Sequence, residues 1–113
     1  MNATTECMFE INGLRMHASL AGAGRPLLLL HGFTGSAATW AGLMARLAPR
    51  RQCIALDLIG HGSSGAPADP ARYTMECAVA DIAGILDALG VPSVDLLGYS
   101  LGGRLALQFA VAA

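Results

Sequence analysis

The sequence predicts an α/β fold in which helices alternate with the strands of a mostly parallel sheet. Three short, mostly apolar runs, 27–30, 53–58 and 94–97, have the character of strands buried on both faces. Segments with helical apolar spacing follow each of them. The chain is 54% hydrophobic and only 13% charged, against about 25% charged in an average soluble domain. Strands buried on both faces would explain this excess, and so would a missing part of the fold.

An N-terminal hairpin is predicted over residues 8–20. Asn12-Gly13 is a strong signal for a two-residue turn. Apolar residues alternate with polar ones on both sides of it, at Phe9, Ile11, Leu14, Met16, Ala18 and Leu20. These alternating positions predict one buried face.

Three helices are predicted. One covers residues 37–48 and ends at Pro49, with a buried stripe at Trp40, Leu43, Met44 and Leu47. Another is capped by Thr74 and stopped by Gly90 and Pro92, with a stripe at Met75, Val79, Ile82, Leu86 and Leu89. The last begins at Leu101. Strands alternating with helices imply right-handed crossovers between parallel strands.

Composition limits the function and the compartment. A net charge of −1 gives no basic field for nucleic acid or an acidic membrane. Three cysteines without a C-x-x-C pair favour a reducing compartment. With no basic region followed by an apolar stretch at the N-terminus, and no apolar run of about 18 residues, the expected location is the cytoplasm, without membrane association.

Gly98-Tyr99-Ser100-Leu101-Gly102 lies at the junction of a predicted strand and a predicted helix. This is the context of a nucleophile elbow, in which a serine sits on a strained turn between closely packed elements. The Leu101 N–H would then stabilise an oxyanion at the start of the helix. The alternative is an ordinary turn serine in a glycine-rich corner.

The other polar loops also follow predicted strands. In His31-Gly32-Phe33 the Phe33 N–H is the candidate for a second oxyanion donor, and a plain turn is the alternative. Asp57 and His61 precede Ser100 in the chain, whereas a triad acid and base follow the serine in an elbow enzyme. We therefore expect Asp57 and His61 to organise loop hydrogen bonds, His31 to brace its loop, and His17 to be exposed on an edge strand.

The motifs HGFTG, DLIGHGSS and GYSLGG, in this order and spacing, resemble the N-terminal half of the α/β-hydrolase superfamily. The resemblance implies a Ser-His-Asp triad of which only Ser100 lies in these 113 residues. We therefore expect residues 1–113 to be the N-terminal part of a single α/β-hydrolase domain. The incomplete fold would be cut after the helix that follows the elbow, with the sheet edge at 94–97 unpaired.

HGFTGSAATW and GYSLGGRLAL further resemble the synthases that make 2-succinyl-6-hydroxy-2,4-cyclohexadiene-1-carboxylate in menaquinone biosynthesis. The resemblance implies a lyase that eliminates pyruvate from a small-molecule carboxylate, with no cofactor and no metal. Tyr99 would neighbour the substrate and Arg104 would pair with a substrate carboxylate; for Arg104 the alternative is a surface arginine. Two other hypotheses remain: a serine hydrolase acting on an ester or C–C bond, and a catalytically inert fragment. The sequence does not indicate an oligomeric state.

Overall fold

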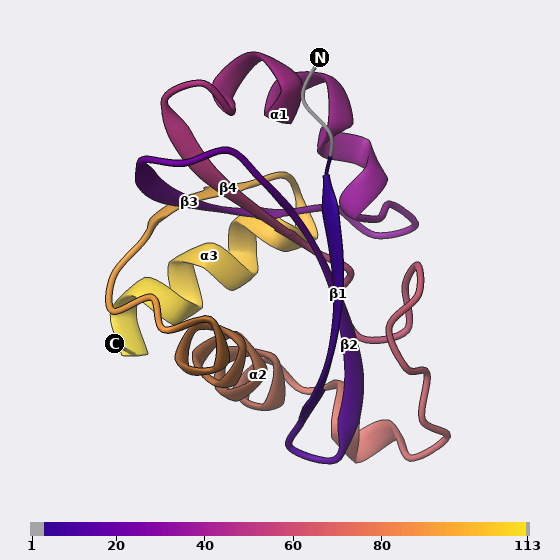
Figure 1. Ribbon diagram of the computed structural model, residues 1–113. Helices are drawn as coiled ribbons and strands as arrows, with labels where there is room; N and C mark the ends of the chain where they lie inside the picture. The colour runs from indigo at the N-terminus through magenta and orange to yellow at the C-terminus, as the bar shows by residue number, and fades with distance from the viewer. Residues whose placement is uncertain (1–3, 113) are drawn as a thin grey trace.

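The computed structural model describes residues 4–112, which form a five-stranded sheet with helices on both faces (Figure 1). The strand order is β1-β2-β4-β3-β5. Strands β3, β4 and β5 are parallel, and the hairpin β1-β2 joins them antiparallel through β2. The predicted α/β class is confirmed. The strands are β1 Thr5–Ile11, β2 Leu14–Ala21, β3 Arg25–Leu30, β4 Arg51–Leu56 and β5 Asp95–Gly98. The helices are α1 Ala41–Leu47, α2 Met75–Leu89 and α3 Leu101–Ala112.

The predicted hairpin turn is present. Asn12 and Gly13 both have positive φ, 52° and 78°, as a two-residue turn matched to the strand twist requires. Ile11 pairs with Leu14 next to the turn. The alternating positions Ile11, Leu14, Met16 and Ala18 are buried, as the alternation predicts. The strands extend the hairpin beyond the predicted range, back to Thr5.

The parallel strands divide their side chains between two cores. Leu28, Leu30, Ile54 and Leu56 face the core under α2 and α3. Leu27, Leu29, Cys53 and Ala55 face the smaller core under α1. All eight are less than 9% exposed, so both faces of β3 and β4 are buried. In Figure 1, α1 lies on one side of these strands and α2 and α3 on the other.

The helix predicted over 37–48 begins differently. Residues Ala37–Trp40 form a 3₁₀ turn, and α1 starts only at Ala41. Ser36 and Thr39 form a capping box around the turn. The Ala37 N–H donates to the Asp57 carboxylate at 2.7 Å, a contact that fixes the tight first turn. Leu43 is 37% exposed and lies off the buried stripe.

The remaining helix signals are confirmed. The Thr74 side chain accepts the Cys77 N–H, and Gly90 ends α2 in the left-handed conformation. The strand predicted over 53–58 runs from Arg51 to Leu56, so Asp57 and Leu58 start a loop. Within residues 4–112, β5 pairs with β3 alone, and Leu97 on it is 38% exposed. No described helix is long and apolar enough to cross a membrane.

Candidate active site

Ser100 occupies a sharp turn between β5 and α3, with a φ of 54°. A positive φ is costly for a residue with a side chain. The two glycines around it permit the close approach of strand and helix. A Cβ on Gly98 would lie 2.3 Å from the Gly102 carbonyl oxygen, and a Cβ on Gly102 would lie 2.0 Å from the Leu30 carbonyl oxygen. The strand-turn-helix context predicted for a nucleophile elbow is therefore present around an exposed Ser100.

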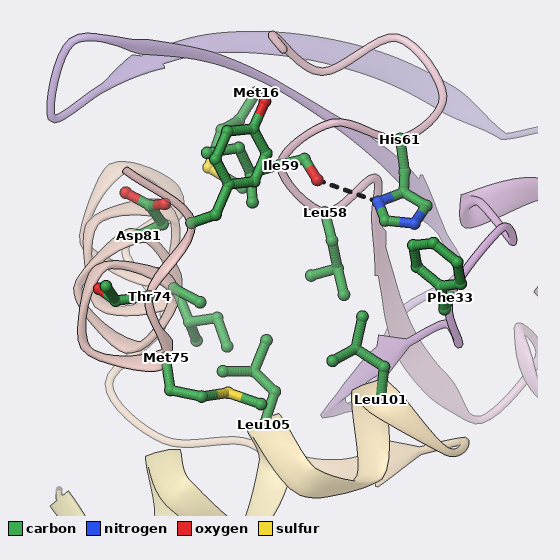
Figure 2. Close-up of a pocket in the computed structure, with 13 residues that line it drawn as sticks. Met16, Phe33, Leu58, Ile59, His61, Thr74, Met75, Asp81, Leu101 and Leu105 are labelled. Atoms are coloured by element: carbon green, nitrogen blue, oxygen red, sulfur yellow. Dashed lines mark hydrogen bonds between the residues drawn. The ribbon is translucent and has the colours of Figure 1, made fainter. Parts of the chain in front are cut away.

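Leu101 is the first residue of α3, so its N–H has no partner within the helix. Among the hydrogen bonds of residues 4–112, none has the N–H of Leu101 or of Phe33 as donor. Both groups thus remain available to a negatively charged oxygen. Their side chains lie on the same side of one pocket (Figure 2).

The Gly32–Phe33 peptide has a fixed orientation. Its carbonyl oxygen accepts from His31 Nδ1–H at 2.7 Å and from the Gly35 N–H at 3.0 Å. Because the C=O and N–H of a trans peptide point in opposite directions, the Phe33 N–H is directed away from these donors. His31 is fully buried, and its Nε2 accepts the Leu58 N–H at 3.0 Å. His31 braces its loop, as expected.

The imidazole of His31 is held in the neutral form. Burial lowers the pKa of His31, and the nearby His61 lowers it further, against the raising effect of the bond to Gly32. A neutral ring with its proton on Nδ1 satisfies both contacts, since Nε2 must accept and Nδ1 must donate. Neither nitrogen is then left to activate Ser100.

Asp57 and His61 do not pair with each other. The Asp57 carboxylate accepts from the Ala37 N–H at 2.7 Å and the Ser63 N–H at 2.8 Å. His61 accepts the Thr34 N–H at Nε2, 3.1 Å, and donates from Nδ1 to the Ile59 carbonyl, 2.9 Å. Both residues organise loop hydrogen bonds, as predicted. Although burial raises the pKa of Asp57, these N–H donors and His17 hold it below its usual range.

The expectation for His17 was wrong. β2 is not an edge strand, because it lies between β1 and β4. The His17 side chain is only 14% exposed and contacts Asp57 Oδ2 and Glu6 Oε1, each at 2.7 Å. The hairpin signal did not indicate which of its strands joins the sheet, so the burial of His17 was not visible from the sequence. No sequence pattern pairs Glu6 with this histidine.

A mainly apolar pocket of about 190 Å³ opens beside the two candidate oxyanion donors. Figure 2 shows Phe33, His61 and Leu101 on one side and Asp81 with Thr74 on the other. Arg72 donates two hydrogen bonds to the Asp81 carboxylate, at 2.9 and 2.7 Å. The lining residues are Met16, Phe33, Leu58, Ile59, His61, Tyr73, Thr74, Met75, Ala78, Asp81, Ile82, Leu101 and Leu105. An apolar part of a substrate would fit this space.

The pocket does not include three of the predicted site residues. Ser100, Tyr99 and Arg104 are all exposed and lie outside its lining. The Tyr99 ring packs against Gly32, where an added Cβ would lie 2.9 Å from it. Arg104 is one helical turn beyond Ser100, and its N–H donates to the Ser100 carbonyl at 3.1 Å. The described chain thus brings the two candidate oxyanion donors, Phe33 and Leu101, to one pocket and leaves Arg104 on the surface.

A nucleophile-elbow turn on a parallel sheet defines the class of α/β-hydrolase-type proteins. The profile of the alpha/beta hydrolase fold family matches residues 25–113. The chain therefore belongs to the α/β-hydrolase fold family.

Individual relatives differ in their chemistry. "Epoxide hydrolase 4" of Mus musculus is 41% identical over 95% of this chain and 31% of its own length. A Bacillus subtilis protein provisionally named 2-succinyl-6-hydroxy-2,4-cyclohexadiene-1-carboxylate synthase is 42% identical over 79% of this chain and 32% of its own. The 2-hydroxy-6-oxo-2,4-heptadienoate hydrolase of Pseudomonas putida is 39% identical over 98% of this chain and 41% of its own.

Solved structures agree in fold. The epoxide hydrolase from Vigna radiata superposes with a TM-score of 0.92, at 30% identity, over 96% of this chain and 35% of its own. The chain spans about a third of the length of the first relatives it matches. The family is therefore shown, whereas the reaction of the whole protein is a matter for proposal.

Proposed function

We propose that this chain supplies the serine-bearing part of a lyase similar to 2-succinyl-6-hydroxy-2,4-cyclohexadiene-1-carboxylate synthase, which eliminates pyruvate from a carboxylate substrate. The observation that carries the proposal is the strained, exposed Ser100 on a turn closed by Gly98 and Gly102. Its support in sequence is the 42% identity to the Bacillus subtilis relative.

The chemistry assigns a role to each group. Ser100, activated by a histidine-aspartate pair outside these residues, helps to remove a proton from a carbon beside a carbonyl. The electron pair left behind moves to break a C–O bond, and the leaving group departs as the enolate of pyruvate, which takes up a proton to become pyruvate. The N–H groups of Phe33 and Leu101 stabilise the enolate oxygen formed on the way. Arg104, exposed one turn beyond Ser100, is the proposed partner of a substrate carboxylate, because a guanidinium binds carboxylates in bidentate fashion.

The second candidate is a serine hydrolase that cleaves an ester or a C–C bond. The apolar pocket beside Phe33 and Leu101 favours it, as does the Pseudomonas putida hydrolase, aligned over 98% of this chain. Ser100 would attack a carbonyl carbon, form an acyl-enzyme and release it to water.

Epoxide hydrolysis fits Ser100 less well. A serine that opens an epoxide forms an ether, which water does not cleave, so the enzyme would stop after one turnover. An acyl-serine is an ester and can be hydrolysed. The serine thus favours carbonyl substrates although two of the similar proteins are named epoxide hydrolases.

For residues 1–113 alone we propose that the chain is catalytically inert. None of the three histidines is placed to activate Ser100 within the described residues, because His17, His31 and His61 are each engaged at both ring nitrogens. A serine without a base keeps only the contribution of binding and oxyanion stabilisation.

The test uses the 113-residue chain and a chimaera joining it to the C-terminal remainder of the Bacillus subtilis relative. The precursor of the synthase reaction is added, and pyruvate and the cyclohexadiene product are quantified. The lyase predicts stoichiometric pyruvate that disappears with Ser100→Ala. Hydrolysis of dienoate or simple ester substrates by the chimaera, with no pyruvate released, would establish the second candidate instead. Turnover by the 113-residue chain alone would refute its inertness.

Arg104 is tested in the same chimaera. Arg104→Ala should raise KM for the carboxylate substrate about 10-fold or more, the loss expected for a charged hydrogen bond, and Arg104→Lys should recover part of it. Arg46→Ala, at another exposed arginine in α1, is the matched control and should leave KM unchanged. Equal KM values in all variants would exclude Arg104 from substrate binding.

A further inference from the structure

Both peptides that flank Phe33 are hydrogen-bonded to an imidazole. His31 contacts the carbonyl of the Gly32–Phe33 peptide, and His61 contacts the N–H of the Phe33–Thr34 peptide. We propose that His61 is a positioning residue which, together with His31, fixes Phe33 so that its N–H is directed at the reacting oxygen. This inference rests on the proposed role of the Phe33 N–H as an oxyanion donor.

The His61 bond holds a strained segment. Thr34 has a φ of 69°, a conformation that a β-branched residue rarely adopts. Its N–H donates to His61 Nε2 at 3.1 Å. The Phe33 ring meets the His61 ring edge-on, with centroids 5.7 Å apart. Loops release such strain unless the surrounding structure opposes it, and here the opposing contact comes from a loop 27 residues further along the chain.

The geometry determines the protonation state of His61. Its Nε2 accepts from a backbone N–H, and its Nδ1 faces the Ile59 carbonyl, which can only accept. The ring is therefore neutral with its proton on Nδ1. The opposite tautomer, or an imidazolium, would place two N–H groups against each other at Thr34 and break the contact.

His31 adopts the same tautomer for the same reason. Its Nε2 accepts the Leu58 N–H and its Nδ1–H donates to the Gly32 carbonyl. The two rings lie with their centroids 4.8 Å apart. His31 is hydrogen-bonded to Leu58 and His61 to Ile59, and these two neighbouring residues lie in the loop after β4. This one loop therefore fixes both of the imidazoles that contact the peptides on either side of Phe33. A hydrogen bond to the Gly32 carbonyl also polarises that peptide and strengthens its N–H as a donor.

The position of His61 in the pocket agrees with this role. Figure 2 shows the His61 ring beside Phe33 and hydrogen-bonded to Ile59, with Leu101 on the neighbouring helix. Because both its nitrogens are engaged, His61 contributes no proton to the reaction. Its contribution is the orientation of a backbone donor.

Nuclear magnetic resonance of the ¹⁵N-labelled 113-residue chain tests the contact directly. We expect His61 to show the Nδ1–H tautomer and a scalar coupling across the hydrogen bond between Thr34 N and His61 Nε2. Residual dipolar couplings report the orientation of the Phe33 N–H. An Nε2–H tautomer, or an imidazolium near neutral pH, would overturn the inference.

Two variants of His61 test whether its acceptor at Nε2 orients the Phe33 N–H or whether the side chain only fills space in the loop. In His61→Gln the side-chain amide reaches the place of Nε2, and its oxygen can accept the Thr34 N–H. In His61→Asn the amide reaches only the place of Nδ1, so the bond to Ile59 can form but the acceptor is lost. We expect the dipolar coupling of Phe33 N–H to change in His61→Asn and to return to the wild-type value in His61→Gln. Unchanged couplings in both variants would overturn the proposal.

The chimaera gives the kinetic counterpart. Loss of one oxyanion donor costs about 10²–10³ in rate, so His61→Asn should lower kcat by up to that factor while KM changes less than about threefold. His61→Gln should recover most of kcat. If both variants turn over like wild type, His61 does not position the donor. If instead Ser100→Ala remains active, the proposed function fails, and the resonance experiment still decides the role of His61.

Discussion

His17 Nδ1 lies 2.7 Å from Asp57 Oδ2, so the middle of β2 is joined to the loop that follows β4. The Asp57 side chain is only 4% exposed and also accepts the N–H groups of Ala37 and Ser63. The Asp57 carboxylate therefore connects three parts of the chain: β2 through His17, the 3₁₀ turn before α1 through Ala37, and the loop after β4 through Ser63. The other nitrogen of the ring contacts Glu6. Both ring nitrogens of His17 therefore face a carboxylate oxygen at hydrogen-bonding distance.

Replacing Asp57 by Asn should destabilise the fold by about 3 kcal/mol, because the carboxylate accepts the N–H groups of Ala37 and Ser63 and each buried donor left unsatisfied costs about 1–3 kcal/mol. The Asn amide would direct N–H groups at donors that previously met a carboxylate. Urea unfolding of the 113-residue chain measures the change. Asp87→Asn, at an exposed carboxylate on α2, is the control and should stay within about 0.5 kcal/mol. A similarly small effect at Asp57 would show that the network contributes little.

The same network predicts acid sensitivity. Burial raises the pKa of Asp57, but the N–H donors and His17 lower it more, so it lies below its usual range. A depressed pKa in the folded state means that the unfolded chain binds the proton first. The contribution to stability is therefore present above the unfolded pKa of about 3.9 and is lost as pH falls through the folded pKa. The free energy of unfolding, measured from about pH 6 to pH 3, should fall less steeply in Asp57→Asn; parallel curves would contradict this.

Gly102 should not tolerate a side chain. A Cβ there would lie 2.0 Å from the backbone oxygen of Leu30, which cannot move without displacing β3. Gly102→Ala should cost more than about 4 kcal/mol, a loss large enough to abolish cooperative unfolding in a small domain. Gly42→Ala is the control, because a Cβ at this position of α1 meets nothing within 4 Å. It should stabilise the chain by about 0.5–1 kcal/mol.

Local patterns were sufficient to predict the elements and the elbow. The apolar runs located β3, β4 and β5, and the glycines around Ser100 indicated the turn that the structure contains. Contacts between distant residues could not be predicted in this way. Nothing near His17 indicates that β2 pairs with β4, and nothing near Ala37 indicates that its N–H bonds to a residue 20 positions away. These two contacts account for the buried histidine and for the late start of α1.

In the candidate site, too, local patterns predicted where residues lie along the chain but not the contacts they make with distant residues. Ser100, Phe33 and Leu101 follow strand ends, where a parallel sheet collects its functional loops. The roles of His31 and His61 depend on which ring nitrogen meets which backbone group, and only the three-dimensional arrangement gives this. For Arg104, helical spacing predicted the distance from Ser100 along α3. It did not predict that the side chain would lie outside the apolar pocket.

The strain at Ser100 predicts an unusual order of stability. Glycine is ordinarily the less stabilising residue because it loses more backbone freedom on folding. At a φ of 54° this order should reverse, since alanine retains the strain and glycine does not. Urea unfolding should therefore show Ser100→Gly to be at least as stable as Ser100→Ala, and the preference for glycine over alanine just before a helix start acts in the same direction. Were the alanine variant the more stable by about 0.5 kcal/mol or more, Ser100 would not be strained, and the physical basis for an elbow at this turn would be lost.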